Sequence, residues 1–308
     1  MPLKKIPLPA GFDKNDTASQ AEGRWIDGDN VRFQYGSPEK IGGWQQISSN
    51  ILVGAGRDIH SFFDLTGRRY VSIGTNKVLY ILFDNVFYDV TPLKTALTSC
   101  TYTSTTGSTT VTINKNSHNL EVGDLLTFSS VTTPGPTTTS FTSANFTTNV
   151  FEIKTVPTVN TFRVTMPVTE TGTGVTAGGT ITTNPYETIG PLASTFGYGW
   201  GAGTWNLSTW GTPRTASNTI IDAGSWALDN FGEFLIATIK DGKTFEWDPA
   251  AGAGVTSRAV VIAGNPTASV LTKVSDRDRH LIHFGTETSI GSPSTQDPMF
   301  IRSQIKKI

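Results

Sequence analysis

A repeated group of four short strand-like runs constrains the fold more than any other feature of this chain. In residues 58–92 the runs are "IHSFFDL", "RRYVSIG", "KVLYILFD" and "VFYDV", separated by turn-forming residues. In residues 225–262 they are "SWALD", "EFLIATI", "KTFEWD" and "SRAVVI", and residues 274–304 repeat three of the four. Four-stranded antiparallel units that recur along a chain are typical of β-propeller blades, because each exposes an apolar face that a neighbour can cover.

The predicted fold class is therefore all-β, with propeller-type blades that are incomplete in this chain. Thr, Ser, Gly, Val, Ile and aromatic residues dominate, and good helix formers never gather into a long amphipathic run. A β-sandwich built of similar meanders is the alternative. Propellers close with roughly four to eight blades, so we expect either that the chain is a fragment of a longer protein or that further blades come from elsewhere.

A segment rich in Thr, Ser and Val separates the first two units. Its runs "TTVTINKNSHNLEVGDLLTFSSV" and "VFEIKTVPTVNTFRVTMPV" alternate like strands, which argues against a disordered linker. They predict a small inserted β-barrel or Ig-like domain whose two ends lie close together. The expected organisation is 1–97 for N-terminal strands and the first blade, 98–185 for the insert, and 186–308 for a Gly/Trp loop and further blades.

The Gly/Trp loop, "FGYGWGAGTWNLSTWGTP" at 196–213, carries Trp200, Trp205 and Trp210 among many glycines. Such a segment does not form a regular helix. Either the tryptophans pack onto the edge of the propeller or the loop forms a contact between subunits, since aromatic residues often anchor interfaces. The prediction for these three residues is the subunit contact.

Composition excludes several classes of protein. The net charge is −1 with both signs scattered, so no basic face predicts binding to nucleic acid or anionic membranes. Cys100 is the single cysteine, which rules out an internal disulfide and a cysteine metal cluster. The start, "MPLKKIPLPAGF", does not read as a signal peptide, and no apolar run is long enough to span a bilayer. We expect a soluble chain without membrane insertion.

No motif predicts catalytic, cofactor-binding or metal-binding residues. "KDGKT" at 240–244 lacks the first glycine of a phosphate-binding loop, since Ala237 stands there, and it reads as a type I′ hairpin turn. In "HLIH", His280 and His283 would point to opposite faces of a strand and could not share a metal. There is no G-x-S-x-G and no H-E-x-x-H.

The stretch "GRWIDGDNVRF" at 23–33 groups Asp27 and Asp29 near two arginines. An EF-hand loop needs a third ligand, a glycine after it and a distal Glu, and none follows at that spacing. A tight turn between the strand-like runs "RWI" and "VRFQY" explains the same residues.

The N-terminal stretch resembles the opening of tail proteins of short-tailed bacteriophages, the nozzle or tail tubular B family. That family carries a W-x-D-G-x-x-V-R-F-x-x-G-x-P-x-K-x-G-G-W run. Its matches here are Trp25, Asp27, Gly28, Val31, Arg32, Phe33, Gly36, Pro38, Lys40, Gly42, Gly43 and Trp44. "SWALDNFGEFLIATIKDGKTFEWDP" and "DRDRHLIHFG" look like later blade segments of the family. This chain departs from the pattern in being shorter than the family's typical members.

The resemblance implies a structural virion protein of the phage tail, assembled in the host cytoplasm. Such proteins form a ring or nozzle, usually a homohexamer, below the head-to-tail adaptor, where it bounds the DNA ejection channel. The implied partners are further copies, the adaptor, tail fibres or other tail proteins, and DNA that passes without sequence-specific binding. Trp25, Asp27, Arg32, Phe33 and Trp44 would be scaffold residues. In this reading Arg24 and Arg32 would pair with carboxylates and would not contact a substrate. A glycan-binding or glycan-cleaving propeller protein and a fibre-attachment module are the alternatives.

Overall fold

In the computed structural model, the chain forms two compact units, residues 1–49 and 50–308. The structure describes residues 9–15, 17, 19–43, 45–46, 49–133, 141–172, 176–194, 222–275, 277 and 280–305. The first unit contains one hairpin, β1 (Val31–Gln34) paired with β2 (Ser37–Lys40). Tyr35 and Gly36 connect the two strands and both have positive φ, 52° and 78°, as a two-residue type I′ turn requires.

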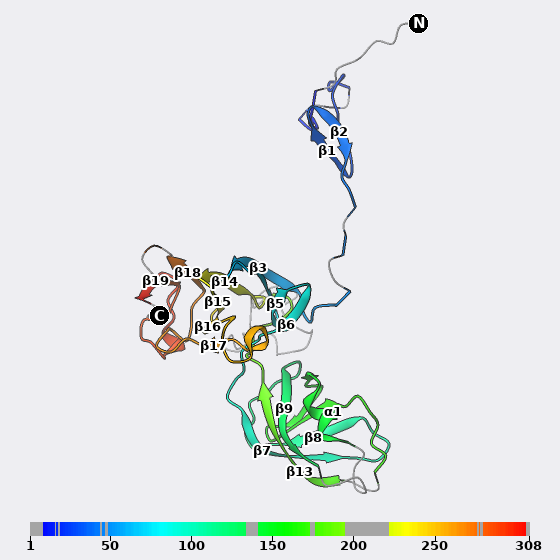
Figure 1. Ribbon diagram of the computed structural model, residues 1–308, viewed down its shortest axis with the longest axis vertical. Coiled ribbons are helices and arrows are strands. Elements are labelled where there is room, and N and C mark those ends of the chain that lie inside the picture. The colour runs from blue at the N-terminus through cyan, green and yellow to red at the C-terminus, as the bar shows by residue number, and fades with distance from the viewer. Residues whose placement is uncertain are drawn as a thin grey trace, which may run out of the picture. The chain divides into compact units, whose positions relative to one another are not determined.

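Two four-stranded meanders and one three-stranded meander form the blade sheets of the second unit, confirming the all-β fold class (Figure 1). The first blade sheet is β3 (Gly56–Phe63), β4 (Arg69–Thr75), β5 (Leu79–Phe83) and β6 (Val86–Asp89). The second is β14 (Trp226–Phe231), β15 (Phe234–Ile239), β16 (Thr244–Trp247) and β17 (Val260–Val261). The third is β18 (Leu271–Ser275), β19 (His280–Phe284) and β20 (Ile301–Ile305). In all three, consecutive strands pair antiparallel, as the repeat predicts.

The blade sheets stack face to face, with the first strand β14 of the second sheet in contact with both β3 and β18. The first and second sheets enclose one apolar cluster, in which Phe62 and Leu79 meet Trp226 and Trp247. The second and third sheets share a smaller cluster containing Ile236 and Leu281. Alternation along β15 explains both clusters: Leu235 faces the first sheet and its neighbour Ile236 faces the third.

Between the first and second blade sheets the chain forms the insert. Its strands are β7 (Leu97–Ser104), β8 (Thr110–Asn114), β9 (Leu125–Thr132), β10 (Phe151–Glu152), β11 (Thr155–Thr158), β12 (Thr161–Thr165) and β13 (Thr176–Pro185). They form one curled sheet in the order β10-β9-β13-β7-β8-β12-β11. Its two edge strands, β10 and β11, are consecutive pieces of one segment, so the sheet curls like a small barrel.

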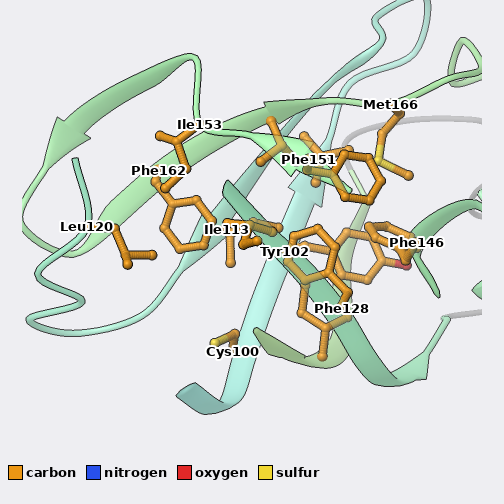
Figure 2. Packing of buried hydrophobic residues seen from close by; sticks show 14 of the residues in the cluster. Cys100, Tyr102, Ile113, Leu120, Phe128, Phe146, Phe151, Ile153, Phe162 and Met166 are labelled. Atoms are coloured by element: carbon orange, nitrogen blue, oxygen red, sulfur yellow. The ribbon is translucent and has the colours of Figure 1, made fainter. Parts of the chain in front are cut away.

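The insert has its own core, which Figure 2 shows. Phe146 of the short helix α1 (Ser143–Thr147) is fully buried against Tyr102 and Phe128. Gly179 on β13 is required beside this core, since a Cβ there would lie 2.0 Å from the Tyr102 ring. None of the helices among the described residues is long and apolar enough to cross a membrane.

Three local expectations need correction. "RWI" is not a strand: Trp25 forms only an isolated bridge to Phe12. "SRAVVI" supplies only the two-residue strand β17. The turn in "KDGKT" is not type I′, because Asp241 has a φ of 57° but Gly242 does not have positive φ. Gly242 instead bridges to Ser269, and this pairing explains its different backbone conformation.

Candidate functional site

The predicted scaffold residues of the N-terminal unit contact one another and their neighbours. Phe33 packs edge-on against Phe12 with 5.2 Å between ring centroids, and lies 6.3 Å from Trp25. Arg32 pairs with Glu39 at 3.1 Å across the β1–β2 hairpin. Phe33 therefore belongs to a small aromatic group, and the Arg32 charge is paired within the hairpin.

Asp27 and Arg24 are engaged in the same way. The Asp27 carboxylate accepts from Lys14 Nζ at 3.1 Å and from the Gly28 amide at 2.9 Å. The Lys14 hydrogen bond, helped by the Gly28 amide, lowers the pKa of Asp27. Arg24 pairs with Asp13. The expectation that Arg24 and Arg32 pair with carboxylates is confirmed.

Trp44, Trp200, Trp205 and Trp210 lie outside the described residues, so their expected roles stay predictions. The base of the Gly/Trp loop is described. The Gly224 amide donates to the Pro191 carbonyl at 2.9 Å. A Cβ added at Gly190 would lie 2.6 Å from the Gly224 Cα, so only glycines permit this approach. Residues 190 and 224, which flank the loop in the sequence, therefore lie directly against each other.

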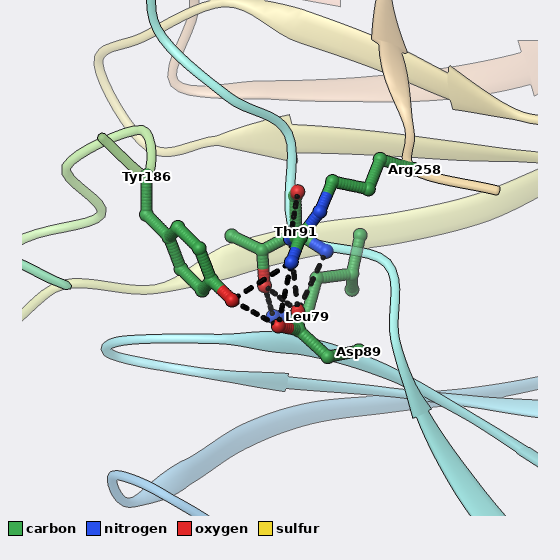
Figure 3. Close-up of polar contacts among 5 residues, drawn as sticks. All are labelled: Leu79, Asp89, Thr91, Tyr186 and Arg258. Atoms are coloured by element: carbon green, nitrogen blue, oxygen red, sulfur yellow. Dashed lines mark hydrogen bonds and ion pairs between the residues drawn. The ribbon is translucent and has the colours of Figure 1, made fainter. Parts of the chain in front are cut away.

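A polar network joins three segments that are distant in sequence, and Figure 3 shows it. Arg258 donates to Asp89 at 3.1 Å, to the Tyr186 hydroxyl at 2.8 Å and to the Thr91 carbonyl at 2.8 Å. The Tyr186 hydroxyl in turn donates to Asp89. The guanidinium also stacks over the Tyr186 ring, 4.6 Å from its centroid. The network fixes the end of β6, the residue after β13 and the segment before β17 to one another.

The chemistry of this network is that of a structural junction. Tyr186 is only 2% exposed. Burial, followed by the Asp89 charge, raises the pKa of Tyr186 above its ordinary value, so the phenol keeps its proton. A tyrosine that acts as a nucleophile would need a lowered pKa. Asp89 is further occupied by the Thr91 hydroxyl at 2.6 Å.

A hollow of about 300 Å³ lies beside Tyr186, between the insert and the first blade sheet. Three carboxylates, Glu121, Asp124 and Glu187, are among the residues that line it. Glu187 pairs with Lys243 at 2.7 Å and Asp124 with Lys94 at 3.9 Å. Two of the three carboxylates are therefore engaged in ion pairs. No group of three or more metal-ligating side chains gathers among the described residues.

One hydrogen bond recurs between the blade sheets, and no single sequence motif predicted it. Asp58 on β3 accepts the Leu228 amide of β14 at 2.9 Å, and Asp229 on β14 accepts the Val274 amide of β18 at 3.0 Å. The first strand of one sheet thus supplies a carboxylate to the first strand of the next, twice. Alignment of "RDIH" with "ALDNF" could have found it, because both place an aspartate in the first strand of a blade sheet.

Comparison with known proteins identifies no family. No family model and no curated protein matches the chain. Among solved structures, the chain is similar to the phage phi92 endosialidase, with 15% identity and a TM-score of 0.23. The match covers 74% of this chain and 34% of that one, so this chain spans about a third of that structure's length. A likeness this distant carries no argument about function.

Proposed function

We propose that this chain is a structural protein of a short-tailed phage tail that joins further copies in a ring, or nozzle, below the head-to-tail adaptor. The ring is a homohexamer that bounds the DNA ejection channel. The observation that carries the proposal is the N-terminal run from Trp25 to Trp44, which resembles the opening of the nozzle family. The contacts of Arg24, Asp27, Arg32 and Phe33 support a scaffold role for that run.

The charge balance of the chain suits this role. With a net charge of −1, it offers no excess of positive charge to DNA phosphates, whose contacts would add strong, salt-dependent affinity. DNA then passes without sequence-specific binding. The proposal includes no cofactor and no catalytic activity of the chain's own.

Immunolabelling tests the location. An antibody raised against residues 93–187 should label intact particles of the encoding phage at the tail, directly below the head. An antibody against the major capsid protein serves as the control for particle integrity. Labelling at the fibre tips would favour the attachment module, and particles without label would contradict a virion role.

The glycan-cleaving alternative retains one observation in its favour, the three carboxylates around the hollow. Of these, Glu121 is exposed. If purified chain released reducing sugar ends from host polysaccharide, and Glu121→Gln abolished the release, the proposed absence of catalysis would be wrong. We expect no release from either chain.

A further inference from the structure

The back face of the first blade sheet is apolar, and among the described residues its part along β3 is open, while Tyr80 on β5 packs against Leu125 and Tyr186. This face consists of the side chains directed away from the second sheet, and cross-strand pairing places Ile59 beside Ile73, and Val71 beside Leu82, on it. Ile59 is 67% exposed, and Phe63 on the same face is 59% exposed. The corresponding face of the second sheet, with Leu235 and Ala237, is almost fully buried against the first. The first sheet therefore has the composition of a covered face, and no blade sheet among the described residues covers it.

The opposite end of the stack has a matching open face. On the third sheet, the side chains directed away from the second include Phe284 and Ile301, which pair across β19 and β20. Ile301 is 58% exposed, and Met299 just before it is 90% exposed. We call the side of each sheet that is directed toward its successor the front face. On the first sheet the front face, with Phe62 and Tyr70, is buried under the second sheet.

The aspartate ties indicate what fits between these two ends. The Leu228 amide donates to Asp58 of the preceding sheet, and the next residue, Asp229, accepts from the Val274 amide of the following sheet. By the same order, Arg57 precedes Asp58, and Ser275 follows Val274. At one end of the stack, the Arg57 amide of the first sheet therefore stands where Leu228 and Val274 donate. At the other end, Ser275 of the third sheet stands where Asp58 and Asp229 accept, and its hydroxyl can accept a hydrogen bond.

We propose that the back face of the first blade sheet binds the third blade sheet of a second copy of this chain, head to tail. The Ser275 region of one copy then meets the Arg57 region of the other, continuing the packing that already occurs twice within the chain. Such a contact uses two different surfaces, and it closes into a ring if its rotation allows. The inference rests on the proposed function in that it names the contact by which the copies of the ring join.

Two chains, each with one added cysteine, test the contact. One full-length chain carries Arg57→Cys and an affinity tag, and the other carries Ser275→Cys without a tag. With a short bis-maleimide, the mixture should yield a covalent pair of copies, and each chain alone should not. The native thiol of Cys100 is buried, and the unmodified chain with the same reagent serves as its control.

A second arm tests the apolar face. Ile59→Asp in the tagged chain should reduce the yield of the pair by roughly tenfold or more, since a charge in a desolvated contact weakens binding. Val159→Asp is the matched control, because Val159 is 72% exposed on the insert. That change should leave the yield unaltered.

Three outcomes would overturn the proposal. Arg57→Cys chains that crosslink to one another would indicate a back-to-back contact. An unlinked chain that is monomeric and loses stability with Ile59→Asp would show that a segment of the same chain covers the face. Particle rings whose copies crosslink elsewhere would reject this contact but leave the proposed function intact. Conversely, the predicted crosslink in a chain absent from virions would refute only the proposed function.

Discussion

His283 is a buried histidine that makes the stability of the third blade sheet depend on pH. It is fully buried on β19, where its Nδ1 lies 2.9 Å from the Thr272 hydroxyl. Burial, with the Arg302 charge next, lowers its pKa from 6.5 to about 4. The neutral form is thus favoured in the folded state. Its contribution to stability is complete above pH 6.5 and is lost as the pH falls towards 4.

The measurement is urea unfolding at pH 7.5 and pH 5. His283 should account for a loss of about 2 kcal/mol in the free energy of unfolding between these values. His283→Gln should remove that part of the pH dependence. His280→Gln, on the half-exposed side of the same strand, should keep it. Equal pH dependence in the wild type and His283→Gln would contradict the assignment.

Gly74 is the residue that allows the first and second blade sheets to approach. A Cβ at this position would lie 2.5 Å from the Trp226 ring, whose Nε1 donates to the Thr75 carbonyl at 2.8 Å. We expect Gly74→Ala to reduce the free energy of unfolding by about 1–3 kcal/mol, the usual effect of overpacking.

Chemical denaturation with tryptophan fluorescence would measure this loss. Gly56→Ala is the control, because Gly56 lies in the neighbouring strand β3 of the same sheet and no atom lies within 4 Å of its added Cβ. It should stay within about 0.5 kcal/mol of the wild type. Equal losses in the two variants would mean that strand propensity matters here and the Trp226 contact does not.

At the scale of elements, the insert is closed at its base. Leu93 bridges Tyr186, the Lys94 amide donates to the Pro185 carbonyl at 2.8 Å, and the Glu187 amide donates to Pro92. The expectation that the two ends lie close together is confirmed. The insert is not wholly separate from the blades, however, because Lys77 pairs with Glu152 at 2.8 Å and Leu125 packs with Val78.

A short Gly/Ser linker in place of residues 97–184 tests this arrangement. The variant keeps Tyr186, so the Asp89–Tyr186–Arg258 network survives and the blades should fold. Loss of the Lys77 and Leu125 contacts should lower Tm by roughly 4–8 °C, which corresponds to about 2 kcal/mol. Circular dichroism during heating measures it, with Arg258→Ala in the same background as the control that removes the network. An aggregated linker variant would show that the insert belongs to the blade core.

The sequence predicted elements better than contacts between them. Runs such as "RRYVSIG" and "EFLIATI" are rich in strand-forming residues, and β4 and β15 cover most of them. Period-2 alternation and turn residues act locally, so they are visible in sequence. Asp89 and Arg258 are 169 positions apart in the sequence, and no local pattern predicts such a pair. The predicted subunit contact of Trp200, Trp205 and Trp210 stays a prediction.

At the scale of the whole molecule, the repeat explains both the fold and the open faces. Each blade sheet buries the back of its successor, as Asp58 and Asp229 mark twice. A stack of such sheets has two unlike ends, and unlike ends can join copies in a closed ring. The ring proposed for the phage tail follows from this geometry together with the N-terminal resemblance.

Electron cryo-microscopy of intact particles tests that central claim most directly. The account predicts a closed ring of copies of this chain immediately below the head-to-tail adaptor, with DNA or an open channel on its axis. The first blade sheet of each copy should face the third of its neighbour. Copies of the chain placed singly at fibres, or a tail ring built without this chain, would contradict the account.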